Sequence, residues 1–365
     1  MKQDEPRILL AGGGTGGHIF PAISVAEEAV RRGGSVHFVG TADRMESKLV
    51  PAAGFTIEYI DVRPLVGGDV KQVMDGLISI PGAVKHASKL VKEYNPHVVV
   101  GVGGYVAGPV VLAAKLLGKP TALMEQNATL GLTNRLLSRI VSRAFVAYEE
   151  TMKSFPEGRA ELTGNPLRKS IIDAARERRN HSKDSNAPVH IVVMGGSQGA
   201  RAIDKLIPEA ISTTVIEREI SVLHQCGEGN EAEVRTHYEA GPIRAEVVRF
   251  IEDVAIELLK ADLVIARSGA TTISEITAMG LPAILLPYPH HTDRQQEKNA
   301  EPMRRAGAAL VFDENQTDAT EIAEAISELL GSPERLDEAS KSSSELGRLD
   351  AAQHVVNGLF GLTGK

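Results

Sequence analysis

The stretch LLAGGGTGGHIFPA, residues Leu9–Ala22, decides the fold class of this chain. The apolar run RILLA leads into a glycine-rich turn, and the apolar residues after the turn recur at helical spacing: Ile19, Ile23, Ala26 and Val30. A strand, a tight turn and a helix in this order form the opening unit of a parallel α/β sheet. The pattern therefore predicts a doubly wound domain that begins here.

The same device recurs in GVGGYVAGP and again in MGGSQGAR, each after an apolar run. Between the last two lies RKSIIDAARERRNHSKDSNAPVH, which is polar and basic and ends in a Ser/Asn/Pro cluster typical of a linker. We therefore expect two α/β domains and a final helix. The expected ranges are 1–165 for the first domain, 166–188 for the linker, 189–345 for the second domain and 346–365 for a helix that packs back on the first.

Composition excludes several classes of protein. A net charge of −7 argues against a general nucleic-acid-binding protein. The single cysteine, Cys226, cannot form an internal disulfide, which fits a reducing compartment, and it is expected to be a small buried hydrophobic residue. The N-terminus has acidic residues where a signal peptide has basic ones. The longest uncharged run, Val98–Ala114, is broken by glycines and a proline and is too short to span a membrane.

The spacing Gly12-x-Gly14-x-x-Gly17 is also that of a dinucleotide-binding turn, which needs an acid at the end of the next strand. That strand ends at Gly40, and the first acid, Asp43, lies beyond it. A P-loop is equally incomplete, because His18-Ile19 follows Gly17 where Lys and Ser or Thr are needed. Both an NAD-linked oxidoreductase and a P-loop enzyme are therefore disfavoured.

The glycine-rich turns bring backbone N–H groups to the starts of helices, where they can approach an anion closely. A diphosphate suits such a site. The chain has no Asp-x-Asp pair, no His-x-x-x-His spacing and no Cys cluster, and the adjacent His290 and His291 are badly spaced to share one ion, so we expect neither a metal ion nor a cofactor. The diphosphate charge would instead meet helix dipoles, backbone amides, Ser197 and Arg168.

Eight motifs carry a resemblance to a known family, and they occur in order over nearly the whole chain: GGGTGGHIFPAISVA, GTADRMESKLVP, GVGGYVAGP, EQNATLGLTNRLL, TGNPLR, GGSQGAR, RSGATTISEITAMGLPAILLPYP and DRQQEKNA. Together they closely resemble the bacterial MurG family. The resemblance implies a GT-B architecture, with two Rossmann-like domains facing a cleft. It also implies an inverting transfer of GlcNAc from UDP-GlcNAc to the 4-hydroxyl of undecaprenyl-pyrophosphoryl-MurNAc-pentapeptide, which converts lipid I to lipid II in peptidoglycan synthesis.

The resemblance also implies a donor site. Glu275 would bind the ribose hydroxyls, the backbone near Ile251 would read uracil, and Ser197 would meet the diphosphate. The other donor-binding positions are Thr15, Gly16, Gly17, Asn127 and Arg168 in the first domain, and Ala270, Thr271, Thr272, Ile273, Ser274, Gln295 and Gln296 in the second.

The transfer needs a base for the acceptor hydroxyl, and two residues compete for that role. His18 stands at a helix start in the glycine turn, where it would act as base or only position the substrate. Glu125 is the rival base, or a carboxylate that orients its neighbours. Family members often have His before this Glu, whereas this chain has Met124. Tyr105 would line the acceptor site or only pack against its turn.

The segment KQVMDGLISIPGAVKHASKLVKEY places an apolar patch that includes Leu77 and Ile78 beside Lys85 and Lys89. Such a face suits anionic headgroups and predicts contact with a membrane surface. The resemblance to the MurG family implies that this is the cytoplasmic face of the bacterial membrane, with the protein bound peripherally. The alternative is an ordinary amphipathic core helix with a solvated basic face. The expected partners are UDP-GlcNAc, the lipid-linked acceptor, the membrane surface and other cell-wall synthesis proteins.

Three other functions compete with this one. A different UDP-sugar enzyme, such as a UDP-GlcNAc 2-epimerase or another lipid glycosyltransferase, would share the fold. An NAD-linked oxidoreductase would need an acid at the end of the second strand, and this chain has none there. A sugar-nucleotide-binding module would bind the donor without turnover.

Overall fold

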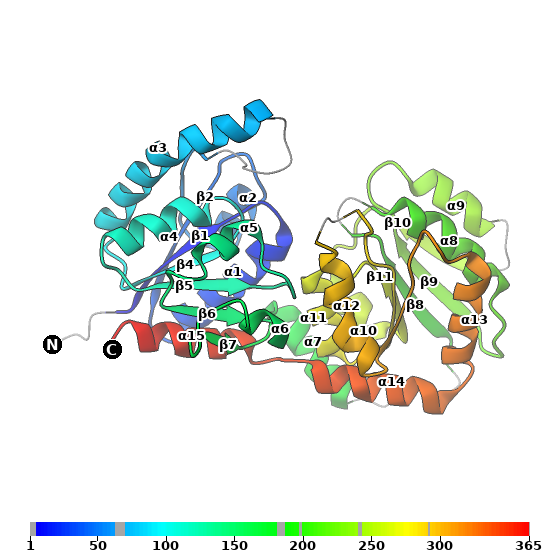
Figure 1. Ribbon diagram of the computed structural model, residues 1–365. Coiled ribbons are helices and arrows are strands. Elements are labelled where there is room, and N and C mark those ends of the chain that lie inside the picture. Colours follow the sequence, from blue (N-terminus) through cyan, green and yellow to red (C-terminus); the bar gives the residue numbers. More distant parts are fainter. Residues whose placement is uncertain are drawn as a thin grey trace. The chain divides into compact units, whose positions relative to one another are not determined.

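Two α/β units, each built on its own parallel sheet, make up the chain (Figure 1). The computed structural model describes residues 5–62, 70–180, 187–196, 199–239, 243–290 and 293–364, without the side chains of residues 70–78. The first unit comprises residues 1–168 and 349–365, and the second comprises residues 169–348. The fold class expected from the sequence is confirmed.

The first unit holds a seven-stranded parallel sheet in the order β3-β2-β1-β4-β5-β6-β7. Its strands are β1 (Arg7–Gly12), β2 (Ser35–Gly40), β3 (Ile57–Tyr59), β4 (Val98–Gly103), β5 (Thr121–Glu125), β6 (Arg143–Val146) and β7 (Ala160–Leu162). Its helices are α1 (Gly16–Arg31), α2 (Glu46–Ala52), α3 (Val70–Tyr94), α4 (Ala107–Leu116), α5 (Leu132–Leu137), α6 (Glu149–Met152) and α15 (Ala351–Leu362).

Strand β1 shows how the sheet of this unit is buried on both faces. Ile8 and Leu10 point into a core shared with α1 and α15, whereas Leu9 and Ala11 point into a core shared with α3 and α4. Alternate residues of a strand face opposite sides, so a strand that is covered on both sides is apolar throughout. Val30 differs from expectation, because it is 48% exposed at the last turn of α1.

The second unit holds a six-stranded parallel sheet in the order β10-β9-β8-β11-β12-β13. Its strands are β8 (Val189–Met194), β9 (Ile220–Gln225), β10 (Arg244–Val248), β11 (Leu263–Ala266), β12 (Ala283–Leu285) and β13 (Ala309–Val311). Its helices are α7 (Lys169–Asn180), α8 (Arg201–Thr213), α9 (Glu231–Glu239), α10 (Val254–Lys260), α11 (Ala270–Met279), α12 (Gln295–Arg305), α13 (Ala319–Leu330) and α14 (Pro333–Leu346). Cys226 is fully buried in the core of this unit, as expected.

The prediction of a linker over residues 166–188 is wrong for residues 169–180. Residues 169–180 form helix α7, which packs on α10 and α11 within the second unit. Its polar composition conceals a narrow apolar stripe, since Ile171, Ala174 and Ala175 are buried at helical spacing. Arg178 fastens the helix by donating from Nη1 to the Leu259 and Ala261 carbonyls at 3.0 and 2.8 Å.

The last helix, α15, belongs to the first unit although 180 residues of the second unit precede it in the chain. It packs on α1, and Val355, Val356 and Leu359 are fully buried in the core around Ile8 and Leu10. The first unit therefore depends on a helix that follows the second unit in sequence.

Leu359→Ala is expected to destabilise the first unit by about 2–5 kcal/mol, because it removes a fully buried side chain and leaves a cavity. Hydrogen exchange read by mass spectrometry will show faster exchange in β1 peptides and unchanged exchange in β8 peptides. Gln353→Ala, at an exposed position of the same helix, is the matched control and should change neither. Equal acceleration in β1 and β8 would contradict the assignment of α15 to the first unit.

Candidate functional site

Both sheets reverse their strand order next to a glycine-rich turn. The reversal lies between β1 and β4 in the first unit and between β8 and β11 in the second. Open parallel sheets bind ligands at the carboxyl ends of the strands at such points. Most of the residues expected to be functional follow the ends of β1, β5, β8, β10 and β11, so each unit has its own set at this edge.

In the first unit, the turns after β1 and β4 touch through their backbones. The Gly13 N–H donates to the Gly103 carbonyl at 3.4 Å. A Cβ on Gly104 would lie 2.5 Å from the Gly13 oxygen, so no other residue fits there without a shift of the backbone. The two turns therefore form one continuous ledge at the end of the sheet.

His18 stands on this ledge in the first turn of α1. Its backbone N–H donates to the Thr15 carbonyl at 3.1 Å, and its ring nitrogen Nδ1 lies 3.0 Å from Oε1 of Gln126, just after β5. A Cβ on Gly103 would lie 2.5 Å from Nδ1, so the imidazole rests against the Gly103 backbone. The side chain is half-buried and fixed on two sides.

Glu125, the rival base, is buried at 3% exposure and organises the loop that follows it. Its Oε1 accepts from the backbone and side-chain nitrogens of Asn127 at 3.1 and 3.2 Å. Its Oε2 accepts from the Gly131 backbone at 3.1 Å and from Asn134 Nδ2 at 2.9 Å. These four donors match the four lone-pair sites of a carboxylate. The arrangement favours an orienting role for Glu125 over a role as base.

The other expected residues of the first unit lie around the same ledge. Thr15 is exposed just before α1, and Gly16 and Gly17 form the start of that helix. The Arg168 guanidinium lies 4.7 Å from the centre of the Phe20 ring, which brings the end of the unit to α1. Tyr105 is half-buried and packs against the core on the α3 and α4 side of the sheet.

Glu46 is a further buried carboxylate beside the glycine turn, and it is not among the residues expected from the sequence. Its carboxylate is 1% exposed and accepts from the Gly14 backbone at 2.9 Å and from the backbone and hydroxyl of Thr41 at 3.0 and 2.8 Å. It thereby ties the turn after β1 to the turn after β2. The sequence feature that could have pointed to Glu46 is its position as an acid three residues after Asp43, at the start of a helix. The first turn of that helix faces the glycine turn. Asp43 itself is exposed, as its place beyond the strand suggested.

In the second unit, helix α11 carries most of the expected donor-binding residues. Ala270 and Ile273 are buried, Thr271, Thr272 and Ser274 are half-buried, and Glu275 is 5% exposed. The Thr271 hydroxyl is buried in the first turn without a hydrogen-bond partner among the described residues. An orphan hydroxyl beside the free N–H groups of a helix start suits an anionic or hydroxylated ligand.

The start of α12 is fastened to the strand ends beside α11. The Ser268 hydroxyl donates to the Gln296 carbonyl at 2.8 Å, and Oε1 of Gln296 accepts from the Tyr288 backbone at 2.9 Å. Asn299 Nδ2 donates to the Ser268 carbonyl at 3.2 Å. The structure thus holds Gln295 and Gln296 next to the turn that leads into α11.

Two more expected donor residues follow strands of this sheet in the sequence. Ile251 is buried at 6% exposure after β10. Ser197, in the turn after β8, lies outside the described residues. Helix α8 begins just beyond that turn, at Arg201.

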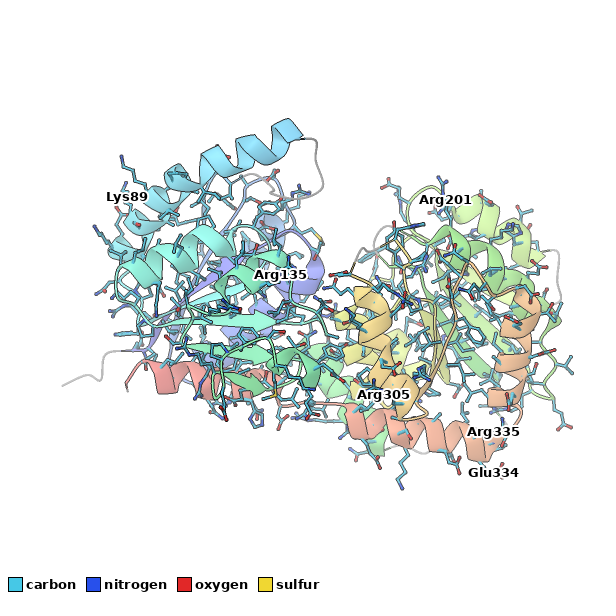
Figure 2. The ribbon with its side chains drawn as sticks, in the orientation of Figure 1. Lys89, Arg135, Arg201, Arg305, Glu334 and Arg335 are labelled. Carbon is cyan, nitrogen blue, oxygen red and sulfur yellow. The ribbon has the colours of Figure 1, made fainter. Side chains whose placement is uncertain are left out.

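The expected membrane face lies on α3. Lys85 and Lys89 are exposed, and Figure 2 shows Lys89 extending outward from the helix. Lys89 lies 3.7 Å from Glu93, a surface pair of little energetic weight. Ala83 is buried, and Ala87 and Val91 lie in the core shared with α4. The side chains of Leu77 and Ile78 lie outside the described part. Among the described residues, no helix has the length and apolar character needed to cross a bilayer.

Two doubly wound parallel domains of this kind define the GT-B architecture of nucleotide-sugar glycosyltransferases. Residues 8–146 match the glycosyltransferase family 28 N-terminal domain, and residues 190–355 match the glycosyltransferase family 28 C-terminal domain. The two matches together cover most of the chain.

Relatives over nearly the full length define the family further. A UDP-N-acetylglucosamine--N-acetylmuramyl-(pentapeptide) pyrophosphoryl-undecaprenol N-acetylglucosamine transferase of Myxococcus xanthus (strain DK1622) is 41% identical over 96% of this chain and 91% of its own. The same enzyme of Shewanella loihica is 38% identical over 99% of this chain and 98% of its own. The crystal structure of Acinetobacter baumannii MurG matches 98% of this chain and 99% of its own with a TM-score of 0.81 at 30% identity. The chain belongs to this family, the MurG transferases.

Glu46→Ala is expected to lower the free energy of unfolding by about 1–3 kcal/mol, because it leaves the N–H groups of Gly14 and Thr41 without an acceptor. Urea unfolding followed by circular dichroism measures this change. Glu58→Ala is the matched control, since Glu58 is exposed on β3 and should be neutral. A Glu46→Ala protein as stable as the Glu58→Ala protein would show that the tie between the two turns is dispensable.

Proposed function

We propose that this protein transfers GlcNAc from UDP-GlcNAc to the 4-hydroxyl of the MurNAc in undecaprenyl-pyrophosphoryl-MurNAc-pentapeptide, forming lipid II for peptidoglycan synthesis. The observation that carries the proposal is the identity of 41% over 96% of the chain with a transferase named for this reaction. Two features support the proposal further: a histidine in the glycine turn after β1 in the first unit, and helix starts at the strand ends of the second unit.

His18 is our candidate for the base. As the acceptor oxygen bonds to C1 of GlcNAc, the bond from C1 to the UDP oxygen breaks and its electron pair leaves with the diphosphate. His18 takes the acceptor hydroxyl proton on Nε2 and later passes it to water. The full engagement of Glu125 by its own loop supports this choice between the two candidates.

The second unit is our candidate for the donor site. The starts of α8 and α11 have no side-chain cap hydrogen bond among the described residues, so their backbone N–H groups and the positive ends of their helix dipoles support a site for the diphosphate. Glu275 on α11 would accept hydrogen bonds from the ribose hydroxyls, and the backbone at Ile251 would contact uracil. Gln295 and Gln296 would bind the sugar. Ser197 would complete the set in this unit, and Asn127 and Arg168 stay predicted donor-binding residues of the first unit.

The acceptor carries a lipid, so we place the enzyme at the cytoplasmic face of the membrane through α3. The exposed Lys85 and Lys89 support contact with anionic headgroups. We also expect contact with other cell-wall synthesis proteins that act at the same membrane surface.

Release of UDP from UDP-GlcNAc in the presence of a short-chain lipid I analogue is expected, with none in its absence. His18→Ala should lower kcat by about 10²–10⁴-fold, the usual contribution of a general base. Glu275→Ala should instead act mainly on KM for UDP-GlcNAc, by about 10–100-fold, because it removes hydrogen bonds to the donor.

Other outcomes of this assay favour other functions. Loss of UDP-GlcNAc without acceptor would favour a UDP-GlcNAc 2-epimerase, and binding without turnover would favour a sugar-nucleotide-binding module. A full kcat in His18→Ala with a large loss in Glu125→Gln would reverse the assignment of the base.

The double variant Lys85→Glu/Lys89→Glu should bind phosphatidylglycerol vesicles about 10-fold more weakly or worse in a sedimentation assay, because each surface cation contributes about 1 kcal/mol. Lys205→Glu/Lys341→Glu makes the same charge change at exposed positions of the second unit and should bind normally. Leu77→Ser/Ile78→Ser should weaken binding to neutral vesicles. Unchanged binding in both α3 variants would exclude this helix as the membrane face.

A further inference from the structure

Gln126, a residue assigned no role so far, joins His18 to the sheet. It is 2% exposed and follows β5 directly. Its amide nitrogen Nε2 donates to the Val102 carbonyl at 3.1 Å, and its oxygen Oε1 lies 3.0 Å from His18 Nδ1. The side chain therefore spans the end of β4 between the two groups.

The Val102 carbonyl is available because of an irregularity in the sheet. Pairing between β1 and β4 runs from Ala11 with Gly101 to Gly12 with Gly103, so the register skips Val102. A bulge of this kind leaves the extra residue out of the ladder. Gln126 Nε2 takes up that carbonyl and satisfies a group buried at the strand end.

This bond decides which end of the amide faces His18. A carbonyl oxygen can only accept, so the Gln126 atom that faces Val102 must be the NH₂ group. The other end, facing Nδ1, must then be the amide oxygen, which has no proton to give. The hydrogen bond at 3.0 Å consequently requires the proton to be on Nδ1 of His18.

We propose that Gln126 is a positioning residue that fixes His18 as the Nδ1–H tautomer and so keeps the lone pair on Nε2 for the acceptor proton. Nε2 makes no hydrogen bond to the residues that the structure describes. The Gly103 backbone packs against the Nδ1 edge of the imidazole and so restricts other orientations of the ring. The role in transfer rests on the proposed function, whereas the tautomer itself does not.

A neutral amide differs from the carboxylate that orients many catalytic histidines. It sets the tautomer and the direction of the ring without adding a negative charge beside it. After transfer, the imidazolium therefore has no anionic partner at Nδ1 to hold it, and Nε2 returns its proton to water.

The first test is a ¹⁵N nuclear magnetic resonance spectrum of the whole chain labelled on its 11 histidines, with His18 assigned by the signal lost in His18→Ala. We expect a protonated-type shift at Nδ1 and an unprotonated-type shift at Nε2 near neutral pH. In Gln126→Leu the two nitrogens should move towards a tautomer mixture. An Nε2–H tautomer in the unaltered chain would overturn the proposal, and this measurement needs no turnover and no variant of Gln126.

The second test is a kinetic cycle with the lipid I analogue. Gln126→Leu should lower kcat by about 10–100-fold with KM for UDP-GlcNAc within about threefold, a share of what a general base contributes. His18→Ala/Gln126→Leu should be no slower than His18→Ala, because Gln126 acts through His18. Gln353→Leu, at an exposed site, is the matched control. A loss of kcat in the double variant equal to the product of the two single losses would overturn the proposal. No turnover by the unaltered chain would instead refute the proposed function.

Discussion

The contact between the backbones after β1 and β4 is the constraint on which the first unit's site depends. Gly13 bonds to Gly103, and the Gly104 position leaves no room for a Cβ beside the Gly13 oxygen. The ledge built in this way lets the start of α1 come close to the end of β5. His18 can then reach a side chain 108 residues away in sequence. A larger residue at either turn would separate these strand ends and remove the platform under the imidazole.

Buried polar side chains hold this arrangement at both margins of the ledge. Glu46 fastens the turn after β1 to the turn after β2, and Glu125 fastens the loop that begins after β5. Both carboxylates accept hydrogen bonds from backbone and side-chain donors of the segments that they join. The acids near this glycine turn thus act as internal ties. A dinucleotide-binding turn differs in this respect, since its acid is directed to a ribose.

The sequence predicted what local patterns determine. The strand, turn and helix at residues 7–31 follow from apolar spacing and glycine, and so do the second parallel domain and helix α15. Helix α7 was missed because polar residues outnumber its apolar stripe. Glu46 and Gln126 were missed because their partners, Gly14 and His18, lie 32 and 108 residues away. Such pairings are set by sheet order, which spacing along the chain does not reveal. The donor-binding roles stay predictions that rest on family resemblance.

The placement of α15 has a consequence for how the chain reaches its native state. The second unit is an insertion between residues 168 and 349 of the first. During synthesis the second unit can complete its core while the first still lacks Val355, Val356 and Leu359. The apolar face of α1 that these residues cover stays open to water until the ribosome has passed them. The first unit therefore begins first and completes its core last. The nascent chain exposes an apolar, aggregation-prone surface during the whole synthesis of the second unit.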